Sequence, residues 1–522
     1  MSSIQHLRER NLIKAIKGYE NALRVFTKSK TPAEYANIEF LLGSAYSYLA
    51  EIRDKEANIR FAIEALTEAS KIYTKETFPI NYAAVENNLG NCYQILSEVK
   101  ENEAEENLEL SIRAFRKALN IYTKDAFPES FAMAQNNLGS SYNYLANIKS
   151  PEINAKLSIK AYEEALAVYD KKTYPLDFAM TQCNLATAYN SLAEINENKE
   201  KNALLALKAA DEALSVYTKE ALPVYYASAQ NVRGTALRLL AEVKDREAEA
   251  NLKLSIVAYK EALSIFEKEA FPLYFAITQK NLGNSFTRLA NISDTEANSQ
   301  LAIQAFKEAL DIYTKDKYPK EYADNKTNLG AAYTCLAGVR DKQVNAELAV
   351  MVLKDALAIR TKQISPIAYA PIQKNLGVAY WILSEVKATE VNALLAIKAC
   401  KEALAIYTKE TFPLQYAATN NNLGIAYQIL AKVSDKDANL MNSIQAYKEA
   451  LAFRTKEAFP LDYATTQNNL GNAYSLLAET KDKELNTQLA VKAFQEALTI
   501  YTKAFPERHE RTTENLRRVR PE

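Results

Sequence analysis

Residues 272–319 read PLYFAITQKNLGNSFTRLANISDTEANSQLAIQAFKEALDIYTKDKYP. Between Leu301 and Tyr313 the apolar residues recur at the three- and four-residue spacing of one buried helix face, and lysine and glutamate take the positions between them. The half that precedes Ala290 also has the pattern of a helix. Proline lacks an amide hydrogen and disfavours helical geometry in the residue before it, so Pro319 is expected to close the second helix. The stretch therefore predicts a helical hairpin.

The same stretch recurs along the whole chain of 522 residues. Eleven of the fourteen prolines stand 46 to 49 residues apart, and they are Pro32, Pro79, Pro128, Pro175, Pro223, Pro272, Pro319, Pro366, Pro413, Pro460 and Pro506. A fixed period of this size indicates that one supersecondary unit has been copied and stacked. The predicted fold is therefore all-α, an α-solenoid of about ten long helical hairpins with terminal capping helices.

Glycine and asparagine return in register with the prolines. Glycine inside a helix costs about 1 kcal/mol relative to alanine, so its return predicts two helix backbones that cross too closely for a side chain. These glycines are Gly43, Gly90, Gly139, Gly234, Gly283, Gly330, Gly377, Gly424 and Gly471, with Ala186 in the remaining copy. An asparagine ends each turn between the two helices, and we expect a side-chain to backbone bond there that locks the hairpin. These asparagines are Asn58, Asn107, Asn154, Asn202, Asn251, Asn298, Asn345, Asn392, Asn439 and Asn486.

The composition is that of an ordinary folded protein. Apolar residues make up 48% and charged residues 25%, and the 64 basic residues balance the 64 acidic ones, which argues against disorder and against a general binder of nucleic acid or membrane surfaces. No stretch approaches the roughly 20 apolar residues that span a bilayer, and residues 1–10 lack the apolar core of a signal peptide, so a cytoplasmic location is expected. Four dispersed cysteines are expected to be reduced packing residues, and they are Cys92, Cys183, Cys335 and Cys400.

The order of these residues resembles the tetratricopeptide repeat across nearly the whole chain: Asn-Leu-Gly, an aromatic residue, a second helix with a small residue, an aromatic and alanine, and then proline. The repeat is longer than the usual ~34 residues, which makes it similar to the long-helix variety of kinesin light chains and of archaeal and cyanobacterial arrays. The resemblance implies a right-handed superhelix and a single solenoid over residues 1–522. We expect an N-terminal capping helix in residues 1–31, ten hairpins in residues 32–505 and a C-terminal capping helix in residues 506–522.

The resemblance also implies a concave groove lined by the first helices, and function is expected where the copies differ on that face. The positions three before the glycine, one after it and four or five after it carry neutral amides in the N-terminal half and cations in the middle. A wall with several cations attracts carboxylate-rich ligands. The simpler interpretation is that solvated charges drift between repeats. The candidate ligand-binding residues are Arg238, Lys280, Asn284, Arg288, Lys326, Asn328, Lys374 and Trp381.

Two departures from the repeat stand out in this region. Arg233 replaces a core leucine, so the fifth hairpin must pack differently or direct the cation outward, because a buried unpaired arginine is too costly. Trp381, the only tryptophan, stands where other copies place polar residues, either as an aromatic anchor for a partner or as a side chain packed on a neighbouring repeat. Lys280, Asn284 and Asn328 match part of the set with which some tetratricopeptide domains grip a terminal carboxylate, but the cations of the third repeat in that set are missing.

The chain has little material for catalysis. Its two histidines, His6 and His509, are too few for a triad or a multi-histidine metal site, and no Cys-x-x-Cys, Walker loop or Gly-x-Gly-x-x-Gly is present. We therefore expect no enzyme, no cofactor and no metal.

The expected function is a non-catalytic scaffold that binds a peptide or protein segment, with an acidic segment favoured, in the groove. One alternative is helical-repeat RNA binding, which needs a continuous basic track that the outer repeats do not supply. Another is a self-associating structural or sensor arm of a signalling or defence system. The sequence leaves the partner, the pathway and the oligomeric state open.

Overall fold

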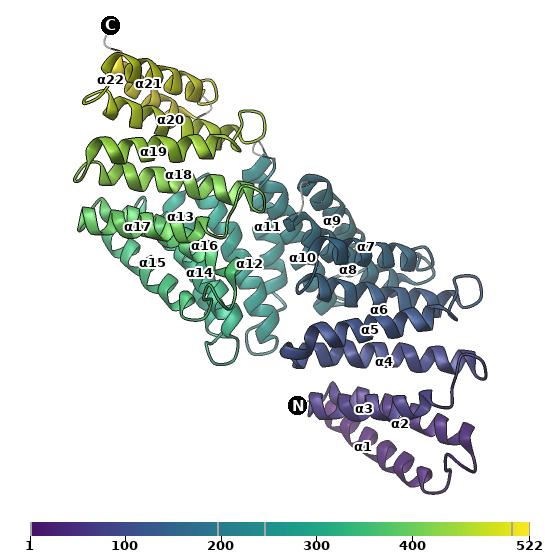
Figure 1. Cartoon of the computed structure of the whole chain (residues 1–522). Helices are drawn as coiled ribbons and strands as arrows, with labels where there is room; N and C mark the ends of the chain where they lie inside the picture. Colours follow the sequence, from purple (N-terminus) through teal and green to yellow (C-terminus); the bar gives the residue numbers. More distant parts are fainter. Residues whose placement is uncertain (1–2, 196–197, 245–246, 503–504, 521–522) are drawn as a thin grey trace. The chain divides into compact units, whose positions relative to one another are not determined.

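The structure is a computed structural model, and it describes residues 3–195, 198–244, 247–502 and 505–520. These residues form α-helices joined by short turns, without a β-strand. Consecutive helices lie side by side within residues 3–263 and within residues 272–519, and each first helix packs most extensively on the second helix of its own hairpin (Figure 1). The prediction of an all-α solenoid of helical hairpins is confirmed.

The chain divides into two compact units, and the first comprises residues 1–265. A single helix, α1, precedes five hairpins in this unit. The helices are α1 (Ser3–Leu23), α2 (Pro32–Ala50), α3 (Lys55–Ser70), α4 (Pro79–Val99), the short η1 (Glu101–Glu103), α5 (Ala104–Leu119), α6 (Pro128–Ala146), α7 (Pro151–Leu166), α8 (Pro175–Ile195), α9 (Lys199–Leu214), α10 (Pro223–Ala241) and α11 (Ala248–Leu263).

The second unit comprises residues 266–522 and contains five hairpins followed by a single helix, α22. Its helices are α12 (Pro272–Ala290), α13 (Thr295–Leu310), α14 (Pro319–Ala337), α15 (Lys342–Leu357), α16 (Pro366–Ser384), α17 (Thr389–Leu404), α18 (Pro413–Leu430), α19 (Lys436–Leu451), α20 (Pro460–Leu477), α21 (Lys483–Leu498) and α22 (Pro506–Val519).

The repeated prolines begin the first helices and do not close the second ones. Helix α13 ends at Leu310, nine residues before Pro319, which is the first residue of α14. A proline fits the first turn of a helix, because an amide hydrogen there has no partner within the helix. The residues between the helices form turns held by backbone bonds, such as the 2.9 Å bond from Tyr318 N to Thr314 O. The expectation that the proline closes the second helix was therefore wrong, although the hairpin is as predicted.

The asparagine bond that the sequence predicts is present in eight hairpins. Asn392 Nδ2 donates to the backbone oxygen of Lys387 at 2.6 Å, and Asn58 Nδ2 donates to that of Arg53 at 2.8 Å. In seven hairpins, the residue that follows the accepting carbonyl and precedes the second helix lies in the left-handed region, with φ of 35° to 47°. The asparagine therefore fastens this turn to the second helix.

The repeated glycines make room for side chains of the second helix. A Cβ atom at Gly283 would lie 2.6 Å from the ring of Phe306, which is fully buried. In the copy with Ala186 the aromatic residue is replaced by Ala210, and both alanines belong to one buried cluster. The predicted close approach is confirmed, but its partner is in most hairpins an aromatic ring and not a helix backbone.

Arg233, which departs from the repeat, is not a buried lone charge. Arg233 Nε donates to Asp211 Oδ1 at 2.7 Å, and the arginine side chain remains 27% exposed. Of the two alternatives that the sequence left open for this residue, the structure shows the outward-directed cation. The cysteines are free, and Cys92 and Cys400 are buried, as expected for packing residues.

Candidate functional site

A hollow in each unit is lined by the same positions of the first helices. Counted from the repeated glycine, these are mainly the residues one, four, five and eight after it and the asparagine two before it. Residues at this spacing share one face of a helix. Two of the predicted groove positions, one after the glycine and four or five after it, therefore line a hollow. The third, three before the glycine, contributes no residue to either hollow.

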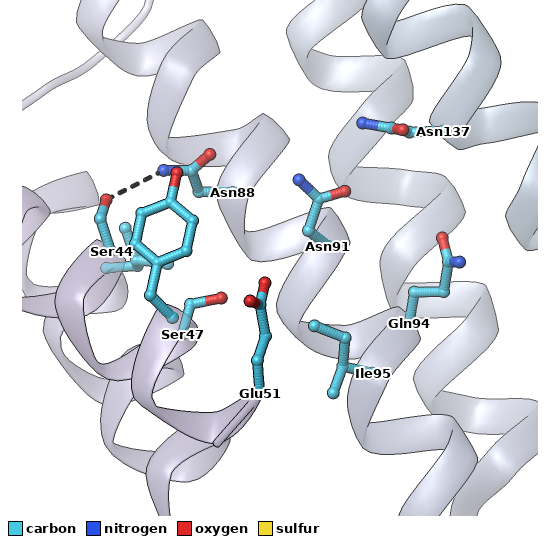
Figure 2. A pocket seen from close by; sticks show the side chains of 10 residues that line it. Ser44, Ser47, Glu51, Asn88, Asn91, Gln94, Ile95 and Asn137 are labelled. Atoms are coloured by element: carbon cyan, nitrogen blue, oxygen red, sulfur yellow. Dashed lines mark hydrogen bonds between the residues drawn. The ribbon is translucent and has the colours of Figure 1, made fainter. Parts of the chain in front are cut away.

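The hollow of the first unit has a volume of 270 Å³ and walls of amide and hydroxyl groups from α2, α4 and α6 (Figure 2). Figure 2 shows Asn88, whose Nδ2 donates to Ser44 Oγ at 3.2 Å, and Asn91 beside it on α4. The carboxylate of Glu51 accepts a hydrogen bond from Arg8 Nη2 at 2.8 Å. This hollow is thus suited to ligands recognised by neutral hydrogen bonds.

The hollow of the second unit has a volume of 1020 Å³ and is lined mainly by α14, α16, α18, α20 and α22. We call it the C-terminal groove. Val378, Trp381, Ile425 and Leu476 lie in its wall and are partly exposed. At the position of Val378 and Ile425 the other first helices of the hairpins carry serine, threonine, asparagine or alanine. Three successive first helices therefore give this groove an apolar patch.

Trp381 packs on the neighbouring repeat, which is one of the two roles that the sequence left open, and its role as an anchor for a partner stays a prediction. It packs against a buried cluster that includes Ala337 and Ala346 of the preceding hairpin, and it also lines the C-terminal groove. Its Nε1 hydrogen is buried without an acceptor in the described part of the chain. The ring is thus held by the fold at the wall of the groove.

The C-terminal groove carries more positive than negative charge. Four basic residues line it, Lys342, Lys432, Arg511 and Arg518, and two acidic residues, Glu385 and Glu479. Lys342 Nζ lies 3.0 Å from a carboxylate oxygen of Glu385, Glu479 accepts from Lys436 at 2.7 Å, and Arg518 bonds to Glu514 at 2.5 Å. Lys432 and Arg511 are exposed and form no ion pair with any residue that the structure describes. These two cations leave the groove with uncompensated positive charge.

Two of the predicted groove cations are paired within the chain. Arg238 is only 9% exposed, and its two Nη atoms each donate to a glutamate oxygen at 2.9 Å, one of Glu194 and one of Glu242. Lys326 Nζ lies 3.3 Å from Asp355 Oδ2. An acidic ligand would have to displace these carboxylates, so neither cation offers a free charge.

Lys280 and Lys374 differ from those two residues. Both are partly buried, and neither forms an ion pair within the described ranges. Burial, and then the positive charges of Arg288 and Arg454, lower the pKa of Lys374 from its ordinary value of 10.5. The structure therefore brings Lys374 and Arg288, two of the predicted residues, within electrostatic reach of one another.

The asparagines two positions before the glycine tie successive first helices together. Asn469 Nδ2, for example, donates to Asn421 Oδ1 on the preceding first helix at 3.3 Å. Asn328 occupies this register on α14, and Asn284 follows the glycine of α12. Neither residue lines the C-terminal groove, and of the eight predicted residues only Trp381 does.

Four of the groove residues that were not predicted differ from the repeat or lie outside it, and the repeat contained a signal for three of them. Val378 and Ile425 are the branched apolar residues at a position that is otherwise small or polar. Lys432 is the only cation eight residues after the glycine register, where the other hairpins have glutamate, asparagine or glycine. Arg511 lies in α22, outside the ten hairpins, for which the sequence predicted only a capping helix.

Other kinds of site find little support in the described part of the chain. Burial raises the pKa of the Cys335 thiol in the groove wall to about 11, so the thiol stays protonated at neutral pH. No three His, Cys, Asp or Glu residues among those described are grouped to hold a metal ion. None of the described helices combines the length and the apolar character needed to cross a membrane.

Solved structures that resemble this one along most of the backbone have low sequence identity to this chain. The human IFIT1 dimer with PPP-AAAA is 16% identical, with 93% of this chain and 93% of that chain covered and a TM-score of 0.43. The apo form of RapI is 15% identical, with 80% and 98% covered and a TM-score of 0.45. The APC/C hetero-tetramer Cut9-Hcn1 is 16% identical, with 100% and 97% covered and a TM-score of 0.31. At these values the likeness carries no argument about function.

No protein-family model and no curated protein matches this chain. The assignment of the fold therefore depends on the helices themselves. Each proline-initiated first helix packs on its second helix, the glycine faces a side chain of that second helix, and the unit recurs in both halves of the chain. The twenty-two α-helices of the described residues stand in the repeat arrangement of a tetratricopeptide-like array.

Proposed function

We propose that this protein is a non-catalytic scaffold whose first helices hold a peptide or protein segment. The observation that carries the proposal is the C-terminal groove, whose walls come from positions that vary among the repeats. The invariant positions are occupied in packing and in turn bonds, so they are not available for recognition. Repeat arrays commonly bind partners along such an extended surface. A cytoplasmic location remains a prediction.

We propose that the bound segment is acidic. Lys280 and Lys374 have no carboxylate partner in the described chain, and a partly buried cation attracts carboxylates more strongly than one in bulk water. The ligand-binding residues proposed for this role are Arg238, Lys280, Asn284, Arg288, Lys326, Asn328, Lys374 and Trp381. Among them the unpaired lysines are the sharpest test, since binding to them requires no exchange of an internal ion pair.

The test is affinity capture from native lysate with the full chain as bait. The double variant Lys280→Gln/Lys374→Gln removes two charges from the first helices. The control Lys398→Gln/Lys492→Gln removes two charges from exposed positions on α17 and α21. We expect the first variant to lose acidic partners that the control retains. Equal capture by both variants would refute acidic recognition at these lysines.

Helical-repeat RNA binding is the alternative that the same preparation can test. Filter binding of single-stranded RNA is measured at low and at physiological salt. Contacts with many phosphates give a steep loss of affinity between the two conditions. Retention of RNA at physiological salt, together with no captured peptide or protein, would favour the alternative over the scaffold.

A further inference from the structure

We propose that the C-terminal groove recognises a peptide segment that carries an apolar anchor residue flanked by carboxylates. This inference rests on the scaffold function proposed above and names the class of partner. Of the eight ligand-binding residues proposed there, the C-terminal groove contains only Trp381. The elements of this recognition are the apolar patch around Trp381 and the two cations Lys432 and Arg511.

The apolar patch would accept the anchor. Val378 and Trp381 come from α16, Ile425 from α18 and Leu476 from α20, and all four side chains are partly exposed in one hollow. Burying apolar surface of this kind is worth about 25 cal/mol per Å², and tryptophan is enriched among the residues that dominate binding. The other first helices are mostly small or polar one residue after the glycine, so the repeat itself does not call for branched apolar residues there. Val378 and Ile425 contact buried clusters of the fold with part of their surface and line the groove with the rest.

The two cations would select the flanking residues. Lys432 stands where the neighbouring hairpins carry Glu385 and Glu479, and each of those glutamates is bonded to a lysine. Lys432 and Arg511 have no such partner among the described residues, so the wall has free positive charge in the turn after α18 and on α22. Carboxylates on the ligand complement this charge.

The chemistry of the wall favours a peptide over a nucleic acid. Two free cations are too few for the continuous phosphate contacts that bind single strands, and the patch contains one aromatic ring where successive bases would need several. Asn472, which also lines the groove, has no hydrogen-bond partner among the described residues and can bond the backbone of a peptide.

The experiment is selection of a phage-displayed library of random peptides on the full chain, followed by titration of labelled peptides by fluorescence anisotropy. Selected sequences are expected to share an apolar residue with aspartate or glutamate nearby. Because Trp381 is the only tryptophan, its intrinsic fluorescence reports occupancy of this groove directly. We expect the selected peptides to change its emission.

The variants separate the anchor from the charges. Val378→Ser/Ile425→Asn introduces residue types that other first helices carry, and unchanged hydrogen exchange of α16 and α18 serves as the check that the fold is kept. We expect this variant to weaken binding at least about tenfold. Lys432→Glu introduces the glutamate of neighbouring repeats, and about fivefold weaker binding is expected, with a smaller salt dependence. Lys398→Glu makes the same charge change on an exposed face of α17 and should leave binding unchanged.

The outcomes distinguish this inference from the scaffold function. If no peptide is selected and lysate capture yields no partner, the scaffold function itself fails. If peptides bind but neither Trp381 emission nor affinity responds to the groove variants, the partner class assigned to this groove is wrong while the scaffold function stands. Quenching of Trp381 by single-stranded RNA and not by any selected peptide would also overturn the inference.

Discussion

Replacement of Gly424 by alanine should destabilise the hairpin of α18 and α19, although alanine is the better helix former. A Cβ atom at this position would lie 2.5 to 2.8 Å from three atoms of the Tyr447 ring. The ring is fully buried, and its hydroxyl donates to Gln428 Oε1 at 3.0 Å. The ring can therefore not move aside without losing packing or this hydrogen bond.

The magnitude follows from two opposing terms. Alanine gains about 1 kcal/mol over glycine within a helix, and forcing an extra carbon into a packed core costs about 1 to 3 kcal/mol. The net expectation for Gly424→Ala is a loss of about 1 kcal/mol. Gly18→Ala in α1 is the matched control, because nothing lies within 4 Å of a Cβ atom there. Only the helix term acts at Gly18, so this variant should be more stable by about 1 kcal/mol.

One hairpin of the chain already contains an alanine in place of the glycine. There Ala186 takes the place of the glycine, and the small residue Ala210 takes the place of the aromatic ring. We therefore expect the effects of substitutions at Gly424 and Tyr447 to depend on one another. In a Tyr447→Ala background, which removes the ring, Gly424→Ala should no longer destabilise and should gain the helix term. A double-mutant cycle isolates this coupling, because both residues are in contact.

The assay is hydrogen exchange of the full chain, read by mass spectrometry on fragments of α18 and α19. A long repeat array does not unfold in a single two-state step, so a local measure of opening is preferable to one melting temperature. A change of about 1.4 kcal/mol alters protection about tenfold. Increased protection of these helices in Gly424→Ala, or an equal loss with and without the Tyr447 ring, would refute the steric explanation.

Three further substitutions test other parts of the fold by the same exchange measurement or by thermal unfolding. Asn392→Ala removes the bond that fastens its turn and leaves a backbone oxygen unpaired, so α17 should lose about 1 to 2 kcal/mol of local stability; unchanged protection would contradict this. Ala388→Asp should gain about 0.5 to 1 kcal/mol, because alanine has a φ of 43° there and aspartate tolerates this region better; a loss would contradict it. Lys374→Asn should stabilise the chain at neutral pH, since burial and then Arg288 and Arg454 disfavour the charged lysine. The unfolded chain holds the Lys374 proton more tightly than the folded chain, so wild-type stability should rise as the pH increases toward the ordinary pKa of 10.5. The advantage of the variant should shrink over the same range. A stability difference between variant and wild type that is the same at neutral and alkaline pH would exclude the effect.

The sequence predicted the hairpin, the register and the asparagine bond because each depends on local and repeated contacts. A turn residue with positive φ and an asparagine at a fixed distance after it occur in seven hairpins, so an interpretation of one turn holds for the others. The role of proline was predicted wrongly because both the end and the start of a helix are consistent with it, and the eight residues between Leu310 and Pro319 gave no helix-breaking signal of their own.

The candidate site was harder to predict because the state of a charge depends on its neighbours in space. Arg238 and Lys374 both look like groove cations in the sequence, yet the first is paired with two glutamates and the second with none in the described chain. Glu194, one of those partners, lies in the preceding hairpin, 44 residues away. Only the packing of one hairpin on the next decides such pairings.

Ion pairs between neighbouring hairpins offer a stricter criterion for function than the number of charges on a face. Lys342 to Glu385 and Lys436 to Glu479 repeat the same link across 43 residues, each joining one hairpin to the next. A lysine in such a link belongs to the fold and contributes little to ligand binding, because a ligand carboxylate would only replace an internal one. Lys432 takes the position of the glutamate in this link, so it cannot serve the fold in the same way. A charge that breaks a repeated pairing at the wall of a groove is thus better evidence for recognition than a basic residue counted along the sequence.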